Sequence, residues 1–146
     1  MLIVSGYDGS PRAEAAIRKA DSLASTMGAE HHIVMVAHLS AYSVATASMP
    51  SAYDIYAYEE EHLTTSIKEI LDTLTVEPTV VLLRGHPAHE LSSYAMEKGA
   101  DLLVVGSRGR GAVRTMLMGS TSHGVLWQHP CDVLVVRGPA DEEEAT

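Results

Sequence analysis

Glycines, arginines and hydroxyl residues are concentrated in one stretch near the C-terminal end of the chain. Two residues separate Gly106 from Gly109, nine residues separate Gly109 from Gly119, and Ser120 and Thr121 follow directly. Glycine permits positive φ or the close approach of a ligand, and free amides at a helix start attract anions. The residue types and their spacing therefore predict a phosphate-binding site.

The spacing differs from the two commonest nucleotide signatures. In a P-loop the last glycine is followed by Lys, and no glycine in this chain has that neighbour. A dinucleotide fingerprint requires a third glycine where this chain has Arg114. The alternative is a tight turn between a strand and a helix that binds no ligand. The specific spacing and the arginines beside it favour a ligand.

The chain is acidic as a whole and basic around this stretch. Its 146 residues carry 10 Lys and Arg against 19 Asp and Glu, a net charge of −9. This excess argues against a general binder of nucleic acid or anionic membrane. From Gly106 to Gly138 the charged residues are four arginines and one acid: Arg108, Arg110, Arg114, Arg137 and Asp132. This contrast indicates a small anionic ligand held locally.

Five short apolar segments alternate with helical segments along the chain. The predicted strands are residues 1–7, 32–38, 79–83, 102–105 and 132–136. The first helix is expected to start at Pro11, with Ser10 as its cap, and to stop at Gly28. A segment without regular pattern, Ser40–Tyr58, precedes the helix that we expect to begin near Glu59.

The remaining helices are expected after Pro87 and over residues 120–128. The alternation predicts a single α/β domain with a five-stranded parallel sheet and helices on both faces. We place this domain at residues 1–138, followed by an acidic, disordered tail at 139–146.

A parallel sheet of order 3-2-1-4-5 would bring two distant segments together. Ligands bind such sheets at the carboxyl ends of the strands, where the winding changes direction. Here that place lies between the first and fourth strands. Gly6 and Asp8 end the first strand, and Gly106 ends the fourth, so both segments would face one crevice.

Further motifs accompany the glycine spacing, and together they cover nearly the whole chain. They are residues 7–10 (Tyr-Asp-Gly-Ser), 85–88 (Gly-His-Pro-Ala), 100–109 and 130–136. With the Gly-x2-Gly-x9-Gly-Ser pattern, they resemble the universal stress protein family, specifically its nucleotide-binding branch. The resemblance implies a Rossmann-like fold of the adenine nucleotide α-hydrolase type and an adenine nucleotide as ligand.

The resemblance also implies roles for individual residues. Asp8 would accept hydrogen bonds from the ribose hydroxyls, Gly6 would let the ligand approach, and the backbone at Val36 would read the adenine edge. The ribose and phosphates would lie against Gly106, Ser107, Arg108, Gly109, Arg110, Gly119, Ser120 and Thr121. ATP is the expected nucleotide, alone or with Mg²⁺, and AMP and ADP are alternatives.

The implied function is that of a regulatory sensor in the stress response, whose conformation depends on the bound nucleotide. A weak ATPase or self-phosphorylating enzyme is one alternative, although no base that would position water is identifiable. A nucleotide-free structural dimer that acts through protein contacts is another.

The resemblance implies a homodimer that pairs the last strand across a two-fold axis. This strand contains Val133, Leu134, Val135 and Val136, and its apolar edge needs covering. A cytoplasmic location is expected from the single cysteine, Cys131, from the strand-like N-terminus, and from apolar segments too short to span a membrane.

Overall fold

One parallel sheet forms the centre of the computed structural model, which describes residues 1–39, 51–109 and 118–138. Its strand order is β3-β2-β1-β4-β5. The strands are β1 (Leu2–Tyr7), β2 (Glu30–Ala37), β3 (Thr79–Arg84), β4 (Leu102–Gly106) and β5 (Asp132–Val136). The predicted parallel sheet and its order are confirmed.

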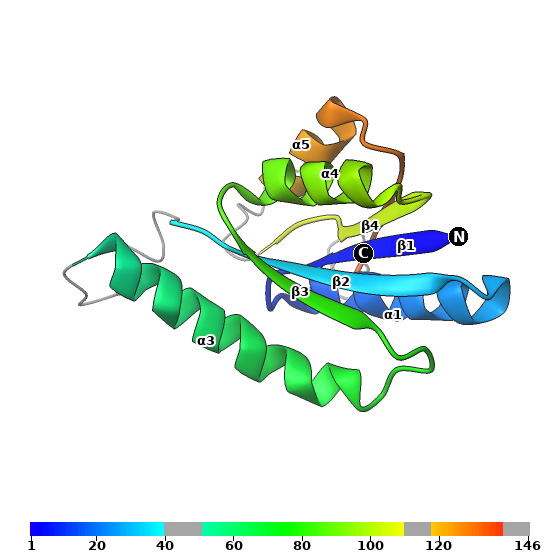
Figure 1. The fold of residues 1–146 in the computed structure, drawn as a ribbon, viewed down its shortest axis with the longest axis horizontal. Coiled ribbons are helices and arrows are strands. Elements are labelled where there is room, and N and C mark those ends of the chain that lie inside the picture. Colours follow the sequence, from blue (N-terminus) through cyan, green and yellow to red (C-terminus); the bar gives the residue numbers. More distant parts are fainter. Residues whose placement is uncertain (40–50, 110–117, 139–146) are drawn as a thin grey trace, which may run out of the picture.

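Helices cover both faces of this sheet, as the alternating pattern predicts (Figure 1). They are α1 (Pro11–Met27), α3 (Ala52–Leu71), α4 (Pro87–Lys98) and α5 (Ser120–Gln128). Helices α1 and α3 lie on one face, and α4 and α5 lie on the other. A Cβ on Gly124 of α5 would lie 2.5 Å from the Cβ of Ala88, so glycine allows α5 to approach α4 closely.

Helix α1 begins and ends where its sequence signals predict. The Ser10 hydroxyl accepts a hydrogen bond from the Ala13 amide at 3.1 Å, Pro11 opens the helix, and Gly28 ends it with φ 63°. Ile17 on its inner face is fully buried. Met27, which the helical spacing also assigns to the buried face, is 53% exposed because it lies in the last turn.

Helix α3 begins earlier than its charged residues suggest. Its first residue is Ala52, and Ser51 caps it by accepting a hydrogen bond from the Asp54 amide at 3.3 Å. The buried stripe starts at Ile55 and includes Glu59, which is only 2% exposed. The prediction of irregular structure up to residue 58 is therefore wrong from Ala52 onward.

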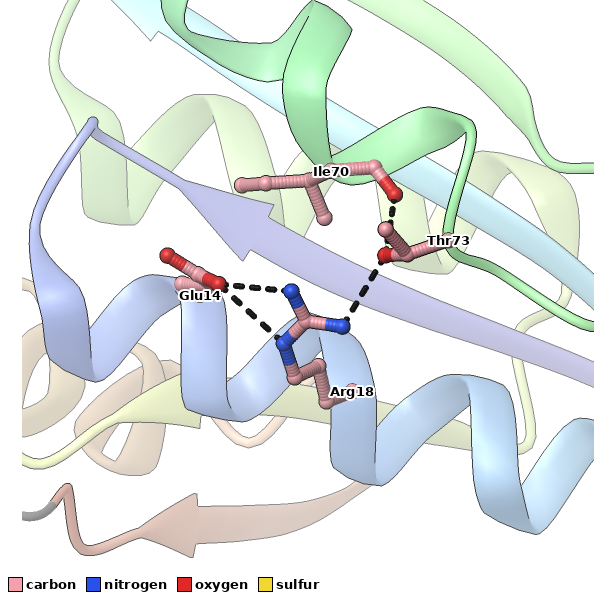
Figure 2. Close-up of polar contacts among 4 residues, drawn as sticks. All are labelled: Glu14, Arg18, Ile70 and Thr73. Carbon is pink, nitrogen blue, oxygen red and sulfur yellow. Dashed lines mark hydrogen bonds and ion pairs between the residues drawn. The ribbon is translucent and has the colours of Figure 1, made fainter.

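Two side chains of α1 hold the connection between α3 and β3. The Arg18 guanidinium donates to Glu14 Oε1 at 2.8 Å and 3.1 Å and to Thr73 Oγ1 at 2.9 Å (Figure 2). The Asp21 carboxylate accepts from the Thr75 and Val76 amides at 3.0 Å and 2.9 Å. These bonds fix helix α1, which begins three residues after Asp8, to the connection between α3 and β3.

A buried histidine lies beneath α1 in the same face. His31 is 1% exposed, and its Nε2 lies 2.9 Å from the Ser5 hydroxyl. Burial lowers the pKa of His31 to about 4, and the opposing attraction of Asp21 is too weak to restore it. The neighbouring His32 points to the other face and lies 2.9 Å from the Tyr94 hydroxyl, as strand alternation requires.

Because of His31, the free energy of unfolding is expected to decrease as the pH falls from about 6.5 to 4. In this window the unfolded chain protonates the imidazole and the folded protein does not, so acid favours unfolding. The loss reaches about 3 kcal/mol at the low end. Urea unfolding between pH 4.5 and 7 checks this prediction, and His31→Gln should flatten the profile. An equally steep profile in His31→Gln would contradict the assignment.

Candidate functional site

The carboxyl ends of β1 and β4 meet at the side chain of Asp8. Its Oδ1 accepts a hydrogen bond from the Ser10 amide at 2.9 Å, which orients the carboxylate. Its Oδ2 lies so close to Gly109 that a Cβ at residue 109 would overlap it. The structure thus brings together two residues that the sequence separates widely and that were predicted to share one crevice.

Backbone hydrogen bonds fix both ends of the glycine-rich loop. The Ser107 amide donates to the Val136 carbonyl of β5 at 2.8 Å, and the Ser107 carbonyl accepts from the Gly119 amide at 2.7 Å. The loop therefore leaves β4 and returns to α5 at nearly the same point. Residues 110–117, among them the predicted Arg110, lie outside the described residues.

The start of α5 offers amides without acceptors inside the helix. The first helical hydrogen bond runs from the His123 amide to the Gly119 carbonyl at 3.0 Å, and no side chain caps the helix. The amides of Ser120, Thr121 and Ser122 precede this bond. Together with the positive end of the helix dipole, they form a favourable environment for an anion.

The backbone of Val36 lies at the level of Asp8. Ala37 accepts a hydrogen bond from the Gly85 amide on the β3 side, at 3.1 Å. Because backbone groups alternate along a strand, those of Val36 point the other way, toward β1. The last β1–β2 pair is Tyr7 with Met35, so Val36 is one residue beyond it, opposite Asp8. The backbone groups of Val36 are therefore directed to the side of the strand on which Asp8 lies.

Close packing, and not positive φ, explains the glycines of the site. Among the described glycines, positive φ occurs at Gly9, Gly28, Gly85 and Gly99. A Cβ at Gly106 would lie 2.8 Å from the Arg12 carbonyl carbon in α1. A Cβ at Gly6 would lie 3.0 Å from Leu91 in α4, so the absent side chain of Gly6 faces the core. The backbone contact requires glycine at residue 106, whereas at residue 6 the end of the Leu91 side chain would have to shift by a few tenths of an ångström to admit a Cβ.

Ser122 is an additional polar residue of this region that was not predicted as part of the site. It is 1% exposed, and its hydroxyl donates toward the carbonyls of Ser107 and Gly119 at 3.2 Å and 3.0 Å. Its position in the first turn of α5, two residues after Ser120, is the sequence feature that could have identified it as part of the site. By contrast, Ser120 is exposed.

The sequence and the fold of the chain are similar to those of known proteins. The model of the universal stress protein family matches residues 1–137. The chain belongs to this family. The universal stress protein YxiE of Bacillus subtilis is 33% identical over 145 residues, which cover 89% of this chain and 94% of YxiE.

Solved universal stress proteins share the fold. UspA from Lactobacillus plantarum superimposes with a TM-score of 0.78 at 24% identity, over 94% of this chain and 97% of UspA. A universal stress protein from Archaeoglobus fulgidus, solved in complex with dAMP, gives a TM-score of 0.63 at 24% identity, over 93% of this chain and 97% of that protein. At these identities the likeness concerns the fold alone.

The described part of this universal stress protein has neither a metal-binding cluster nor a membrane-spanning helix. No group of three or more His, Cys, Asp or Glu side chains there is arranged to hold a metal ion. Within the same residues, no helix has the length and apolar character needed to cross a membrane.

Proposed function

We propose that this universal stress protein belongs to the nucleotide-binding branch and binds ATP, alone or with Mg²⁺, in the crevice between β1 and β4. The observation that carries the proposal is the contact of the Asp8 carboxylate with Gly109 across the point where the sheet changes direction. A carboxylate suits a ribose diol, and the first amides of α5, which have no acceptor inside the helix, suit phosphates. The dAMP bound by the Archaeoglobus fulgidus protein supports an adenine nucleotide as the ligand.

The output of binding would be conformational. Segments from β1, β4, β5 and α5 meet around Ser107 and Gly109 within a few ångströms of one another. A nucleotide that contacts Asp8 and the α5 amides together would bridge these segments and order them. We therefore assign the protein a regulatory or sensing role in the stress response, in the cytoplasm.

A turnover assay distinguishes this role from enzymatic ones. The protein is incubated with ATP, with and without Mg²⁺, and bound nucleotide, free ADP and protein-bound phosphate are measured. We expect stoichiometric bound ATP without continuous release of ADP. Steady ADP release would favour the weak ATPase, and protein-bound phosphate would favour self-phosphorylation. The absence of any bound nucleotide would favour a structural dimer.

We also propose that the protein is a homodimer through β5. This strand forms one edge of the sheet and is apolar on both faces, with Val133 and Val135 packed toward α4 and α5 and Leu134 and Val136 packed toward α1. Its residues 133–136 stay partly exposed. Pairing with the same strand of a second copy would satisfy its outward amides and cover its apolar edge.

Proline at Val135 is expected to weaken this dimer about a hundredfold. The Val136 carbonyl bonds to Ser107 on the β4 side, so by alternation the Val135 amide points outward. Proline removes this outward donor, twice in the symmetric dimer, and leaves the β4–β5 pairing intact. Sedimentation velocity over a concentration series measures the change.

The opposite sheet edge supplies the matched control. The amide of Val80 in β3 points outward by the same alternation, because the Gly85 amide bonds inward to Ala37. Val80→Pro should leave the dimer unchanged. A wild-type monomer at micromolar concentration, or dissociation caused by Val80→Pro alone, would contradict pairing through β5.

A further inference from the structure

Ser122 has a buried hydroxyl that contacts both the β4 loop and the cap of α5. The residue is 1% exposed and lies in the first turn of α5. Its Oγ lies 3.2 Å from the Ser107 carbonyl oxygen and 3.0 Å from the Gly119 carbonyl oxygen. The two carbonyl oxygens share the single hydroxyl proton, so Ser122 serves as a donor within the protein.

The Ser107 carbonyl receives two donors from α5 and its cap. Besides the Ser122 hydroxyl, the Gly119 amide donates to it at 2.7 Å. The backbones are in direct contact there, since a Cβ on Gly119 would lie 3.0 Å from Arg108 Cα and 3.3 Å from the Gly109 amide nitrogen. The hydrogen bonds to the Ser107 carbonyl and this backbone contact thus join the β4 loop to the start of α5.

We infer that Ser122 is a positioning residue that makes the site selective for nucleotides with phosphate groups over the bare nucleoside. The inference rests on the proposed nucleotide function. Ser122 acts through Ser107 and Gly119: it holds the first amides of α5 at a fixed separation from Gly109. The nucleoside half of the ligand would contact the Asp8 carboxylate, which the Ser10 amide orients, and the backbone of Val36 in β2, and neither residue belongs to the β4 loop or to α5.

The test compares the affinities of ATP and adenosine for Ser122→Ala. Loss of the hydroxyl is expected to weaken ATP binding about tenfold and to leave adenosine binding unchanged. The matched control is Ser92→Ala in α4. Ser92 is equally buried at 1% exposure, but its hydroxyl has no hydrogen-bond partner in the described part of the chain, so neither affinity should change.

A second variant and a second readout separate positioning from packing. Ser122→Cys fills a similar space, but its thiol is a weak hydrogen-bond donor, so it should weaken ATP binding as the alanine variant does. If Ser122→Ala does not fold, the ATP and adenosine affinities are compared in Ser122→Cys instead. Hydrogen exchange of the Gly119 amide, measured without ligand, should accelerate in both variants.

The possible outcomes distinguish the positioning role of Ser122 from the proposed binding of nucleotide. Equal losses for ATP and adenosine, unchanged ATP affinity, restoration by cysteine, or unchanged Gly119 exchange would each overturn the positioning role. If the wild-type protein binds neither ligand, the proposed function fails, and with it the selectivity assigned to Ser122.

Discussion

Replacing Gly109 with valine is expected to weaken ATP binding by at least about a hundredfold. The Cβ of any side chain at this position would overlap Asp8 Oδ2, so the carboxylate or the β4 loop must move. Either movement separates the groups that would hold the ribose from those that would hold the phosphates. Isothermal titration calorimetry with ATP measures the loss.

The control for Gly109→Val is a glycine replacement away from the crevice. Gly99 ends α4 with φ 65°, a conformation that asparagine tolerates better than other residues, and nothing lies within 4 Å of a Cβ there. Gly99→Asn should bind ATP as the wild type does. If Gly109→Val bound ATP with wild-type affinity, the glycine-rich loop would not be part of the binding site.

The substitution Asp8→Asn is expected to reduce ATP affinity about tenfold to a hundredfold. The side-chain carbonyl oxygen of the variant can still accept from the Ser10 amide, so the turn after β1 is preserved, whereas the charged acceptor for the ribose diol is lost. The wild type should prefer ATP over 2′,3′-dideoxy-ATP, and Asp8→Asn should abolish this preference. Competition binding with the two nucleotides measures the ratio.

Asp101→Asn provides the same chemical change at the other end of the sheet. Asp101 also accepts a backbone amide, that of Leu2, at 2.7 Å. This variant should keep both the affinity and the preference for the ribose hydroxyls. If Asp8→Asn kept the preference as well, the ribose would lie elsewhere.

Local signals were sufficient to predict most of the fold. The continuous apolar runs of β1, β2 and β4 reflect strands buried on both faces, and Ser10, Pro11 and Gly28 define both ends of α1. The helix predicted over residues 120–128 is confirmed as α5. Interactions between residues that are close in the sequence determine these features, so they can be recognised without the tertiary structure.

The start of α3 could not be predicted for a physical reason. Glu59 lies in the buried stripe between Ile55 and Leu63, and a buried acid breaks the apolar pattern that marks a helix face. Charged residues usually mark a solvated helix start, so the boundary was expected near Glu59, about two turns too late. Without a recognisable row of apolar residues after it, Ser51 alone was a weak indication of a helix start.

The pairing of Asp8 with the glycine loop was predictable from topology, but the packing of the individual glycines was not. The strand order alone places the ends of β1 and β4 side by side. That Gly6 accommodates Leu91, and Gly106 the backbone of Arg12, depends on how α4 and α1 lie on the sheet. Ser122 was missed for the same reason, since its role requires the distance to Ser107.

Native mass spectrometry of the freshly purified protein tests nucleotide binding most directly. The proposed site predicts that each chain carries one adenine nucleotide, or takes up one ATP when ATP is added, and that denaturation releases it intact. Chains that keep their bare mass in the presence of excess ATP, while remaining folded, would contradict the proposed function.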